Sequence, residues 1–534
     1  MNSLYDNYII SAINELPDTQ VDFLQLKKKL SKTYKLPIPT NADMRDRYNQ
    51  LVSQKKIKSS KAFEKILLSR AIRTQSGVAV VAVLTKSYPC PGKCIYCPSE
   101  KDMPKSYLSN EPAVMRAIDS QFNPYLQVQN RLRSLEINGH STDKIELIVM
   151  GGTFSYLPKD YQKKFITRCF QAANEYPRVR KASKVHEVIR SLDEKLLIEQ
   201  KKNEKAKHRI IGLTLETRPD YMDENEILNF RNLGCTRVEL GVQSIFDDVL
   251  ELNKRGHLIQ ETIRATKMLK DAGFKINYHM MPGLPGSTPK RDFDMFKALF
   301  KGPFFQPDML KIYPTVVLKD SVLYNMWKKG NYKPLDDKTF EKLVLKIKNE
   351  VITPYVRIAR LVRDVPTPSI IAGPIVSNLR QIIAHKSHCP CIRCREVREE
   401  YEIKEEIILD RIDYNASDGK EIFLQYVSPD KKKLFALLRL RISDNGNSHF
   451  LPVLKNAALI REVHTYGKLA KIDTKDNTSP QHIGLGKKLL IEAERIAKEE
   501  FGLHKIVVIS GVGVRGYYRK SGYKLSQTYM SKNL

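Results

Sequence analysis

Three cysteines with the spacing Cys90-x3-Cys94-x2-Cys97 follow a short β-branched run. Three thiolates on one tight loop can bind three irons of a [4Fe–4S] cluster and leave the fourth iron open. An open iron can chelate the amino and carboxylate groups of S-adenosylmethionine, and an electron from the cluster then cleaves the sulfonium to a 5′-deoxyadenosyl radical. Zinc is the alternative, but zinc prefers four protein ligands and no fourth cysteine is near. The spacing therefore predicts an iron–sulfur cluster that binds S-adenosylmethionine.

A second cysteine group, Cys389-x-Cys391-x2-Cys394, lies close to His385 and His388. Three thiolates and one imidazole would complete the tetrahedral ligand set of a structural zinc site. The sequence does not decide which histidine, if either, is the fourth ligand. A second iron–sulfur cluster and a run of free cysteines in a reducing cell are the alternatives, and the density of cysteines favours zinc.

A glycine pattern of the form Q-x-x-G-x-G opens a predicted helix at 484–500. At a helix N-terminus this pattern directs backbone N–H groups at an anion, and it is similar to the pyrophosphate loop of the GNAT acyl-CoA-binding fold. After a predicted strand at 505–509, the segment 511–523 resembles the GNAT segment in which a tyrosine faces the CoA sulfur. Tyr517 or Tyr518 would protonate a departing thiolate or line the pantetheine tunnel, with packing as the alternative for one of them. The residues expected at this acetyl-CoA site are Gln481, His482, Ile483, Gly484, Leu485, Gly486, Tyr517 and Tyr518.

Short β-branched runs alternate with helical stretches from about residue 76, which predicts repeated βα units and a parallel sheet, open or closed into a partial barrel. In such folds the chemistry lies at the carboxyl ends of the strands. The six runs are Val78–Leu84, Ile145–Met150, Ile210–Leu215, Val238–Val242, Ile276–Met281 and Met309–Tyr313.

Polar residues and glycines at the ends of these runs are the candidate ligands of S-adenosylmethionine. Gly151 and Gly152, before Thr153, allow close backbone approach and suit an α-amino group, although a tight turn is the alternative. Glu216, Arg218 and Gln243 suit a carboxylate or ribose, or else cap helices. Lys311 lies within an apolar run, so it points into a polar cavity or extends out to solvent; we favour the cavity and a catalytic role.

The C-terminal part has a third pattern. Glu421–Val427 and Leu434–Arg441 alternate strongly enough for an antiparallel sheet. Glu462 and His464, on a further predicted strand, are alternative bases for acyl chemistry, although such a pair is as often structural.

Composition limits the classes of function. The chain has 534 residues, 42% of them apolar, which excludes wholesale disorder. No run approaches the length of a membrane span, and the first residues do not resemble a secretory signal. The eight cysteines cluster instead of forming a disulfide framework, and Cys169 and Cys235 are interpreted as core residues. We expect a cytoplasmic protein with no membrane partner.

A formal net charge of +30 predicts a polyanionic partner, with nucleic acid favoured over a membrane surface. The changes of pattern predict four parts. These are a basic helical module at 1–75 that would bind nucleic acid, a radical core at 76–384, a zinc-binding junction at 385–400 and an acetyl-CoA-binding domain at 401–534. A solvated helical face is the alternative for the basic module.

Together these features resemble the Elongator catalytic-subunit family. The matching stretches include Glu111-Pro-Ala-Val-Met-Arg116, Gly151-Gly-Thr-Phe, Leu215-Glu-Thr-Arg-Pro-Asp220, Cys391-Ile-Arg-Cys-Arg-Glu396 and Ile509-Ser-Gly-Val-Gly-Val-Arg515. One departure is Pro98-Ser99-Glu100, where the family usually has Pro-Gly-Gly. The resemblance implies an α/β fold in which a radical-SAM partial (βα)6 barrel is fused to a GNAT-type α/β acyltransferase domain, with a small helical N-terminal module.

The resemblance also implies a reaction. The family joins radical chemistry and acetyl-CoA to form 5-carboxymethyluridine at the wobble position of tRNA, and the anticodon stem-loop would explain the positive charge. Lys311 would act near the acetyl group or the uracil, and Arg116 and the N-terminal lysines would contact RNA. The alternatives are a protein lysine acetyltransferase that uses the iron–sulfur half as a scaffold, and an RNA-binding scaffold. Accessory subunits and a homo-oligomer both remain open.

Overall fold

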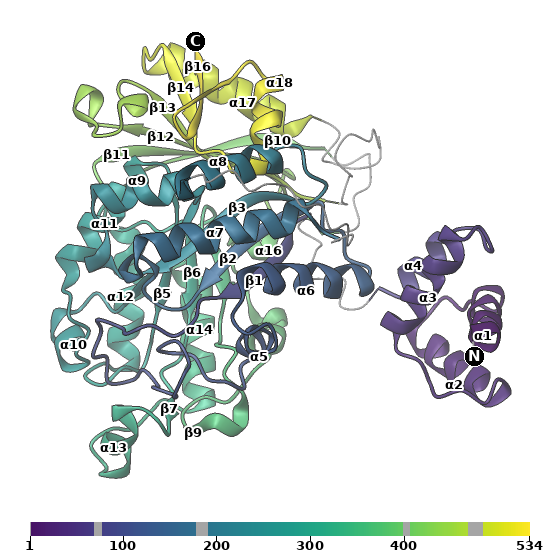
Figure 1. Ribbon diagram of the computed structural model, residues 1–534. Coiled ribbons are helices and arrows are strands. Elements are labelled where there is room, and N and C mark those ends of the chain that lie inside the picture. Colours follow the sequence, from purple (N-terminus) through teal and green to yellow (C-terminus); the bar gives the residue numbers. More distant parts are fainter. Residues whose placement is uncertain (1, 69–76, 178–190, 399–405, 468–483) are drawn as a thin grey trace.

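The computed structural model describes residues 2–68, 77–177, 191–398, 406–467 and 484–534. The first of these ranges is a helical bundle of α1 (Asn2–Asn14), α2 (Gln20–Thr33), α3 (Asn41–Ser53) and α4 (Lys61–Ile66). The Thr19 and Thr40 hydroxyls cap α2 and α3 by accepting hydrogen bonds from backbone N–H groups of the first turn. Buried aromatic rings, among them Tyr8 and Phe23, form the core of the bundle. Figure 1 shows the bundle lying beside the rest of the molecule.

A parallel sheet of seven strands forms the centre of the molecule, and its strands are ordered β1-β2-β3-β4-β5-β6-β8. The six predicted strands are confirmed. The sequence missed the seventh, Arg357–Arg360, because two of its four residues are arginines. The strands are β1 (Ala79–Leu84), β2 (Lys144–Met150), β3 (Arg209–Thr217), β4 (Arg237–Gln243), β5 (Lys275–Met280), β6 (Met309–Ile312) and β8 (Arg357–Arg360).

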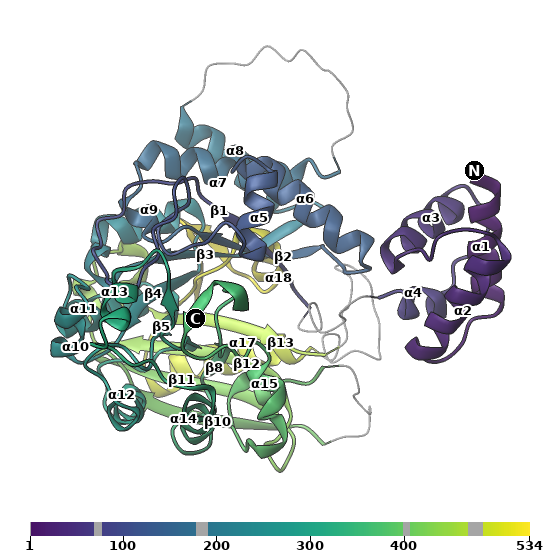
Figure 2. The ribbon, with the colours of Figure 1, turned by 90° about the horizontal axis from the view of Figure 1, so that it is seen from below.

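Helices cover the outer face of this curved sheet, as Figure 2 shows from below. Because side chains alternate along a strand, Val81 and Leu147 are buried under the helices, while Ala82 and Ile148 face the inner side. The helices between residues 112 and 395 are α5 (Pro112–Asp119), α6 (Pro124–Ile137), α7 (Lys159–Asn174), α8 (Leu192–Asn203), α9 (Glu224–Leu233), α10 (Asp247–Leu252), α11 (Ile259–Asp271), α12 (Pro289–Lys301), α13 (Val322–Lys328), α14 (Asp337–Glu350), α15 (Leu379–Ile382) and α16 (Ile392–Arg395). A small antiparallel pair joins β7 (Val317–Leu318) to β9 (Ile370–Ala372).

A second sheet of seven strands forms the C-terminal part, in the order β10-β11-β12-β13-β14-β16-β15. All its neighbours are antiparallel except β13 and β14, which pair in parallel over Ala458–Ile460. A helix between two parallel strands of a mixed sheet agrees with the predicted GNAT-type fold. The elements are β10 (Ile408–Asn415), β11 (Gly419–Val427), β12 (Leu434–Ser443), β13 (Ala458–Thr465), α17 (Leu485–Arg495), β14 (Lys505–Val508), α18 (Arg515–Lys520), β15 (Lys524–Ser526) and β16 (Tyr529–Asn533).

Buried charges join the two sheets. Arg461 on β13 contacts Asp308, the residue before β6, at 2.5 Å, and Glu421 at 2.8 Å. Arg441 on β12 contacts Asp271, the last residue of α11, at 2.5 Å. None of these five side chains is more than 4% exposed. Each of these five charges therefore has an opposite partner, and the pairs with Asp308 and Asp271 join the C-terminal sheet to the part built on the parallel sheet.

Two glycines of the C-terminal part also lie directly against the parallel sheet. A Cβ atom at Gly511 would lie 1.9 Å from the carbonyl oxygen of Ile211 on β3, and one at Gly513 would lie 2.7 Å from the Cβ of Arg209. Neither position has room for a side chain. Among the described helices, none has the length and apolar character needed to cross a membrane.

Candidate active site

A cavity of about 960 Å³ lies on the inner side of the parallel sheet. Its wall contains side chains from the carboxyl ends of β2 to β6, together with the cysteine loop that follows β1. The structure therefore brings predicted residues from distant parts of the chain to one site. Those at the wall are Cys90, Cys94, Cys97, Gly152, Thr153, Glu216, Gln243 and Lys311.

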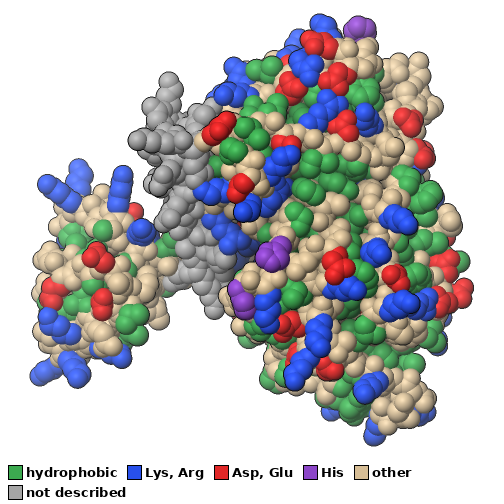
Figure 3. Space-filling view, turned by 180° about the vertical axis from the view of Figure 1, so that it is seen from behind, with side chains coloured by type: hydrophobic (Ala, Val, Ile, Leu, Met, Phe, Trp, Pro, Cys, Tyr) green, Lys and Arg blue, Asp and Glu red, His purple; other side chains and the backbone are tan. Residues whose placement is uncertain are grey.

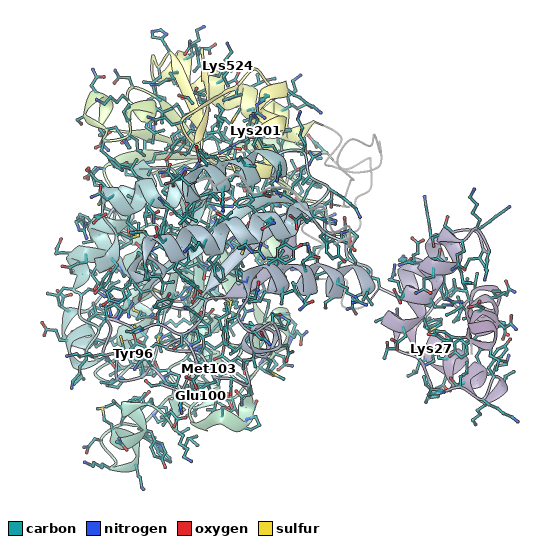
Figure 4. The ribbon with its side chains drawn as sticks, in the orientation of Figure 1. Lys27, Tyr96, Glu100, Met103, Lys201 and Lys524 are labelled. Carbon is teal, nitrogen blue, oxygen red and sulfur yellow. The ribbon has the colours of Figure 1, made fainter. Side chains whose placement is uncertain are left out.

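Backbone hydrogen bonds hold the cysteine loop in place. The Ile95 N–H donates to the Asn253 carbonyl at 3.2 Å, and the Ile95 carbonyl accepts from the Leu323 N–H at 2.8 Å. The residues that depart from the family pattern also have partners. The Ser99 N–H donates to the Asp320 carbonyl at 3.0 Å, and Glu100 accepts from the Ser109 N–H at 2.8 Å. Tyr96, Glu100 and Met103 mark this segment in Figure 4.

The glycine pair after β2 meets a close neighbour. Gly151 has a φ of +139°, and a Cβ atom there would lie 2.0 Å from Oγ1 of Thr85; Gly152 has a φ of +91°. Side chains at these positions would be strained, and at Gly151 would also collide. Of the two, Gly152 lies at the cavity wall, where the absence of a side chain leaves room for a bound α-amino group.

An arginine next to the cysteine loop has one donor without a partner. Arg218, 6% exposed, donates to Asp220 at 2.9 and 2.7 Å and to the Arg255 carbonyl at 2.7 Å. Its Nη1 atom is buried and has no hydrogen-bond partner among the described residues. A Cβ atom at Gly92 would lie 2.4 Å from this Nη1 and 3.6 Å from Sγ of Cys90. The unused donor is suited to an anionic group at the cysteine loop.

Glu239 and Lys311 form a buried ion pair in the cavity. Nε2 of His279 lies 2.8 Å from Glu239, and the Asn277 amide donates to it at 3.1 Å. Burial lowers the pKa of Lys311, but the Glu239 carboxylate outweighs burial and holds that pKa above its usual value. Burial likewise raises the pKa of Glu239, but Lys311 and then His279 hold it well below its usual range. Both groups are therefore charged at neutral pH.

Two further strand ends present polar groups. Glu216 accepts a hydrogen bond from the Tyr107 hydroxyl at 2.7 Å. Gln243 has a φ of +69°, which is uncommon for a residue other than glycine. Its Oε1 atom is buried without a hydrogen-bond partner among the described residues. Such strain often occurs at ligand sites, and the open acceptor suits a ribose hydroxyl.

Sequence reasoning missed Glu239 and gave His279 no role, whereas it named Arg218 among the polar strand ends expected to bind the ligand. A carboxylate inside the apolar run Val238–Val242 was the available signal for Glu239, because an ionised group in a buried strand needs an opposite charge. The pairing of Glu239 with Lys311, 72 residues further along, follows only from the strand order.

The second cysteine group lies at the junction of the two sheets. The thiols of Cys389, Cys391 and Cys394 lie within 4.8 Å of one another, as thiolates around one zinc ion would. His385 and His388 are described, but neither belongs to this group. Lys348 Nζ lies 3.6 Å from Sγ of Cys394. The three thiolates fit a metal ion. Neither predicted histidine lies within 4.8 Å of all three thiols, so neither supplies a fourth ligand in this structure.

The predicted acetyl-CoA loop is only partly described. Gln481, His482 and Ile483 lie outside the described residues, whereas Gly484, Leu485 and Gly486 begin α17. A Cβ atom at Gly486 would lie 3.0 Å from the Tyr517 hydroxyl. Tyr517 is 42% exposed, but Tyr518 packs in the core of the C-terminal sheet. The structure thus places Tyr517 beside the loop and Tyr518 in the core.

Glu462 and His464 differ in their partners. Burial raises the pKa of Glu462, but Lys275 and Arg439, at 3.2 and 2.9 Å, outweigh it and lower that pKa to about 2. Burial lowers the pKa of His464 to about 4. Glu462 is therefore a weak base at neutral pH, and His464 is a neutral imidazole whose Nε2 has no hydrogen-bond partner among the described residues.

The fold and the cavity define the class. Residues 86–298 match the model of the radical SAM superfamily, and residues 307–388 match the radical SAM C-terminal domain. This superfamily implies a [4Fe–4S] cluster and S-adenosylmethionine, which the cysteine loop and Arg218 suit. The molecule is a radical S-adenosylmethionine protein that carries a second, GNAT-like sheet.

Curated relatives identify the family. A protein of Methanocaldococcus infernus named tRNA uridine(34) acetyltransferase is 44% identical over 531 residues, which cover 96% of this chain and 95% of that protein. Human Elongator complex protein 3 is 39% identical over 488 residues, covering 88% and 86% of the two chains. The solved structure of the M. infernus Elp3 with an N-terminal deletion (1–46) is 42% identical, covers 86% of this chain and 100% of its own, and has a TM-score of 0.71. The chain belongs to the Elongator catalytic-subunit (Elp3) family, and the predicted resemblance is confirmed.

Proposed function

We propose that this protein forms 5-carboxymethyluridine at the wobble position of tRNA from acetyl-CoA, with S-adenosylmethionine radical chemistry. One observation supports this most directly. The cavity that contains the cysteine loop extends to Arg357 on β8, and Arg357 donates a hydrogen bond to the Tyr466 hydroxyl, next to β13, at 3.3 Å. A residue of the cavity wall is therefore in direct contact with the C-terminal part expected to bind acetyl-CoA.

The residues for the first cofactor set fit its chemistry. Cys90, Cys94 and Cys97 would bind the cluster, Gly151 and Gly152 the amino group of S-adenosylmethionine, and Gln243 its ribose. When bound, this set supplies a 5′-deoxyadenosyl radical able to abstract a hydrogen atom from the acetyl methyl group. The apolar inner wall, including Ala82 and Ile148, would limit access of water to the reacting atoms.

Lys311 is proposed to bind and orient the reacting carbonyl. Since its ammonium group is charged and paired with Glu239, it can donate a hydrogen bond but cannot act as a base in that state. A carbonyl oxygen of the acetyl group or the uracil is an acceptor it could bind. Glu239 holds the ammonium group and His279 in turn contacts Glu239, so both are positioning residues.

The acyl-CoA site is proposed at the start of α17, where Gly484 to Gly486 leave backbone N–H groups open to a pyrophosphate. Tyr517 lies next to this start and can donate its hydroxyl proton to a departing thiolate. We assign zinc to Cys389, Cys391 and Cys394, where it would stabilise the junction between the sheets.

The tRNA partner is proposed to contact the N-terminal bundle and the arginines at the cavity, among them Arg116. Figure 3 shows Lys and Arg side chains projecting from opposite ends of the bundle. Not every predicted lysine is available, because Lys27 is buried and donates to Asn41 at 3.0 Å. Lys28 and Lys56 are exposed and remain suited to phosphate contact.

Mass spectrometry of the wobble nucleoside tests the proposal. The reconstituted protein is incubated anaerobically with tRNA, acetyl-CoA, S-adenosylmethionine and a reductant, and 5-carboxymethyluridine is expected. Cys94→Ser and Lys311→Met should each abolish the product, while Arg264→Gln, at an exposed position of α11, should leave it unchanged. Acetyl transfer to protein lysines that survives Cys94→Ser, without any modified uridine, would instead establish the lysine acetyltransferase.

A further inference from the structure

Arg255, between α10 and α11, is a buried cation with no carboxylate beside it. The residue is 6% exposed, and no carboxylate among the described residues lies within ion-pair distance of it. Its Nη1 donates to Sγ of Cys94 at 3.3 Å, and its Nη2 donates to the Gly241 carbonyl. Its Nε is also buried and has no hydrogen-bond partner among the described residues. The strongest acceptor of this guanidinium is therefore a cysteine of the predicted cluster.

Other buried arginines are neutralised differently. Arg461 and Arg441 each contact two carboxylates. Arg231 has no carboxylate, but it donates to two carbonyls and lies 4.5 Å above the ring of Tyr529. A buried cation without an opposite charge is costly. Arg255 differs from both kinds, because one of its donors is directed at a thiol, and the thiolates with whatever they bind can supply its opposite charge.

The position of the guanidinium is fixed on several sides. A Cβ atom at Gly241 on β4 would lie 2.7 Å from Nη2 of Arg255, so this strand leaves room for the side chain only because it has a glycine there. The backbone of Arg255 is fixed as well. Its N–H donates to the Leu250 carbonyl at 2.9 Å, and its carbonyl accepts from Arg218 at 2.7 Å.

We propose that Arg255 is the counter-cation of the [4Fe–4S] cluster and raises its reduction potential through the hydrogen bond to Cys94. Three thiolates leave the oxidised cluster with a net negative charge, and reduction adds another negative charge. A fixed positive charge and an N–H donor on sulfur stabilise the reduced state more than the oxidised state. Arg255 is thus a positioning residue for electron uptake. The inference rests on the cluster that the proposed function requires.

A potentiometric titration followed by electron paramagnetic resonance tests this inference. The full chain is reconstituted anaerobically with iron and sulfide, its iron content is measured, and it is reduced stepwise with dithionite. In Arg255→Met, the ratio of reduced to oxidised cluster at a fixed potential should fall at least tenfold, a midpoint about 59 mV more negative for one electron. Arg255→Lys keeps the charge and should recover part of that shift. Arg264→Gln is the matched control and should titrate like the parent protein.

Equal midpoints, within a twofold change of the ratio, for Arg255→Met and the parent protein would overturn the inference. So would Arg255→Lys shifting as far as Arg255→Met. If Arg255→Met folds but binds no iron, the midpoint potential is measured in Gly241→Ala instead. In that variant the added methyl group displaces Nη2 of Arg255 and leaves its charge in place. A smaller shift in the same direction supports the inference, and an unchanged midpoint overturns it. Failure of the parent protein to bind iron would overturn the cluster as well, which separates the two proposals.

Discussion

The parallel sheet with its covering helices makes two very different contacts, one with the C-terminal sheet and one with the N-terminal bundle. The first contains fully buried charges, such as Arg461 between Asp308 and Glu421. The second includes Arg45 of α3, which lies against Gly139 next to the end of α6. The hydrogen abstraction proposed above requires reacting atoms to be placed to within a fraction of an ångström. Binding a phosphate backbone tolerates much more variation.

The difference suggests what buried ion pairs contribute in this molecule. An apolar contact can shift by a residue at small cost, but a buried arginine that leaves its carboxylate is uncompensated. Asp308 also accepts a hydrogen bond from the Ile276 N–H at 2.9 Å, so the ion pair is tied to the backbone of β5. We interpret the charges as fixing one relative position of the two sheets.

The largest expected effect comes from breaking that set of charges. Arg461→Met should lower the free energy of unfolding by about 3–5 kcal/mol, because Asp308 and Glu421 would stay buried and each lose its shortest ion pair, leaving only longer contacts such as that of Arg441 with Glu421 at 3.1 Å. Urea titration measures it. The matched control is Arg411→Met, which removes a partly exposed pair with Glu500 and should cost about 0–1 kcal/mol. Similar losses in both variants would show that burial of the charges has no special importance.

Acid should weaken the contact between the sheets in a defined window. The pKa of Glu462 is lowered from 4.5 to about 2, because Lys275 and Arg439 outweigh its burial. Its carboxylate thus stabilises the folded state fully above about pH 4.5, and that contribution is lost as the pH falls toward 2. Glu462→Gln should be less stable at pH 7 and less sensitive to pH within this window. Parallel unfolding curves of both proteins from pH 5 to pH 2 would contradict the assignment.

Removing the bundle should have a smaller and different effect. Deletion of residues 1–68 should weaken tRNA binding about tenfold and reduce its dependence on salt, because phosphate contacts are lost. The unfolding free energy of the remaining chain should change by less than about 0.5 kcal/mol. Filter binding at several salt concentrations and urea titration measure the two quantities. A remainder that no longer folds would show that the bundle is part of the catalytic unit.

The smallest effect should come from the contact of the bundle itself. Gly139→Ala places a methyl group 2.6 Å from the Arg45 guanidinium carbon at a φ of +86°. Gly330→Ala has a similar φ of +76° but nothing within 4 Å, so it measures the backbone cost alone. Gly139→Ala should cost at most about 0.5 kcal/mol more than this control, measured by thermal unfolding, because loss of the bundle contact relieves the collision. Equal costs would mean that Arg45 moves aside freely.

Patterns that are local in the chain were predictable. The β-branched runs marked six parallel strands, and the cysteine spacing marked both cysteine groups. The strand β8 was not predictable from its own residues, because a run with an arginine at each end lacks the apolar pattern of a buried strand.

Contacts between distant segments were not predictable. Arg255 meets Cys94 across 161 residues, and no spacing rule connects a loop arginine to a cysteine. The same holds for Lys311 and Glu239, which become neighbours only through the order of the strands. Two adjacent tyrosines looked equivalent in the sequence, but the turn of α18 places Tyr517 beside α17 and Tyr518 in the core.

The two glycines against β3 have a consequence for recombination between proteins. In a free-standing acyltransferase domain, no neighbouring strand would exclude a side chain at the positions of Gly511 and Gly513. A chimera that carries even alanine at position 511 would place a methyl group on the Ile211 carbonyl. A C-terminal sheet taken from another protein must therefore have glycine at both positions. We expect the two halves to be inherited and engineered as one unit.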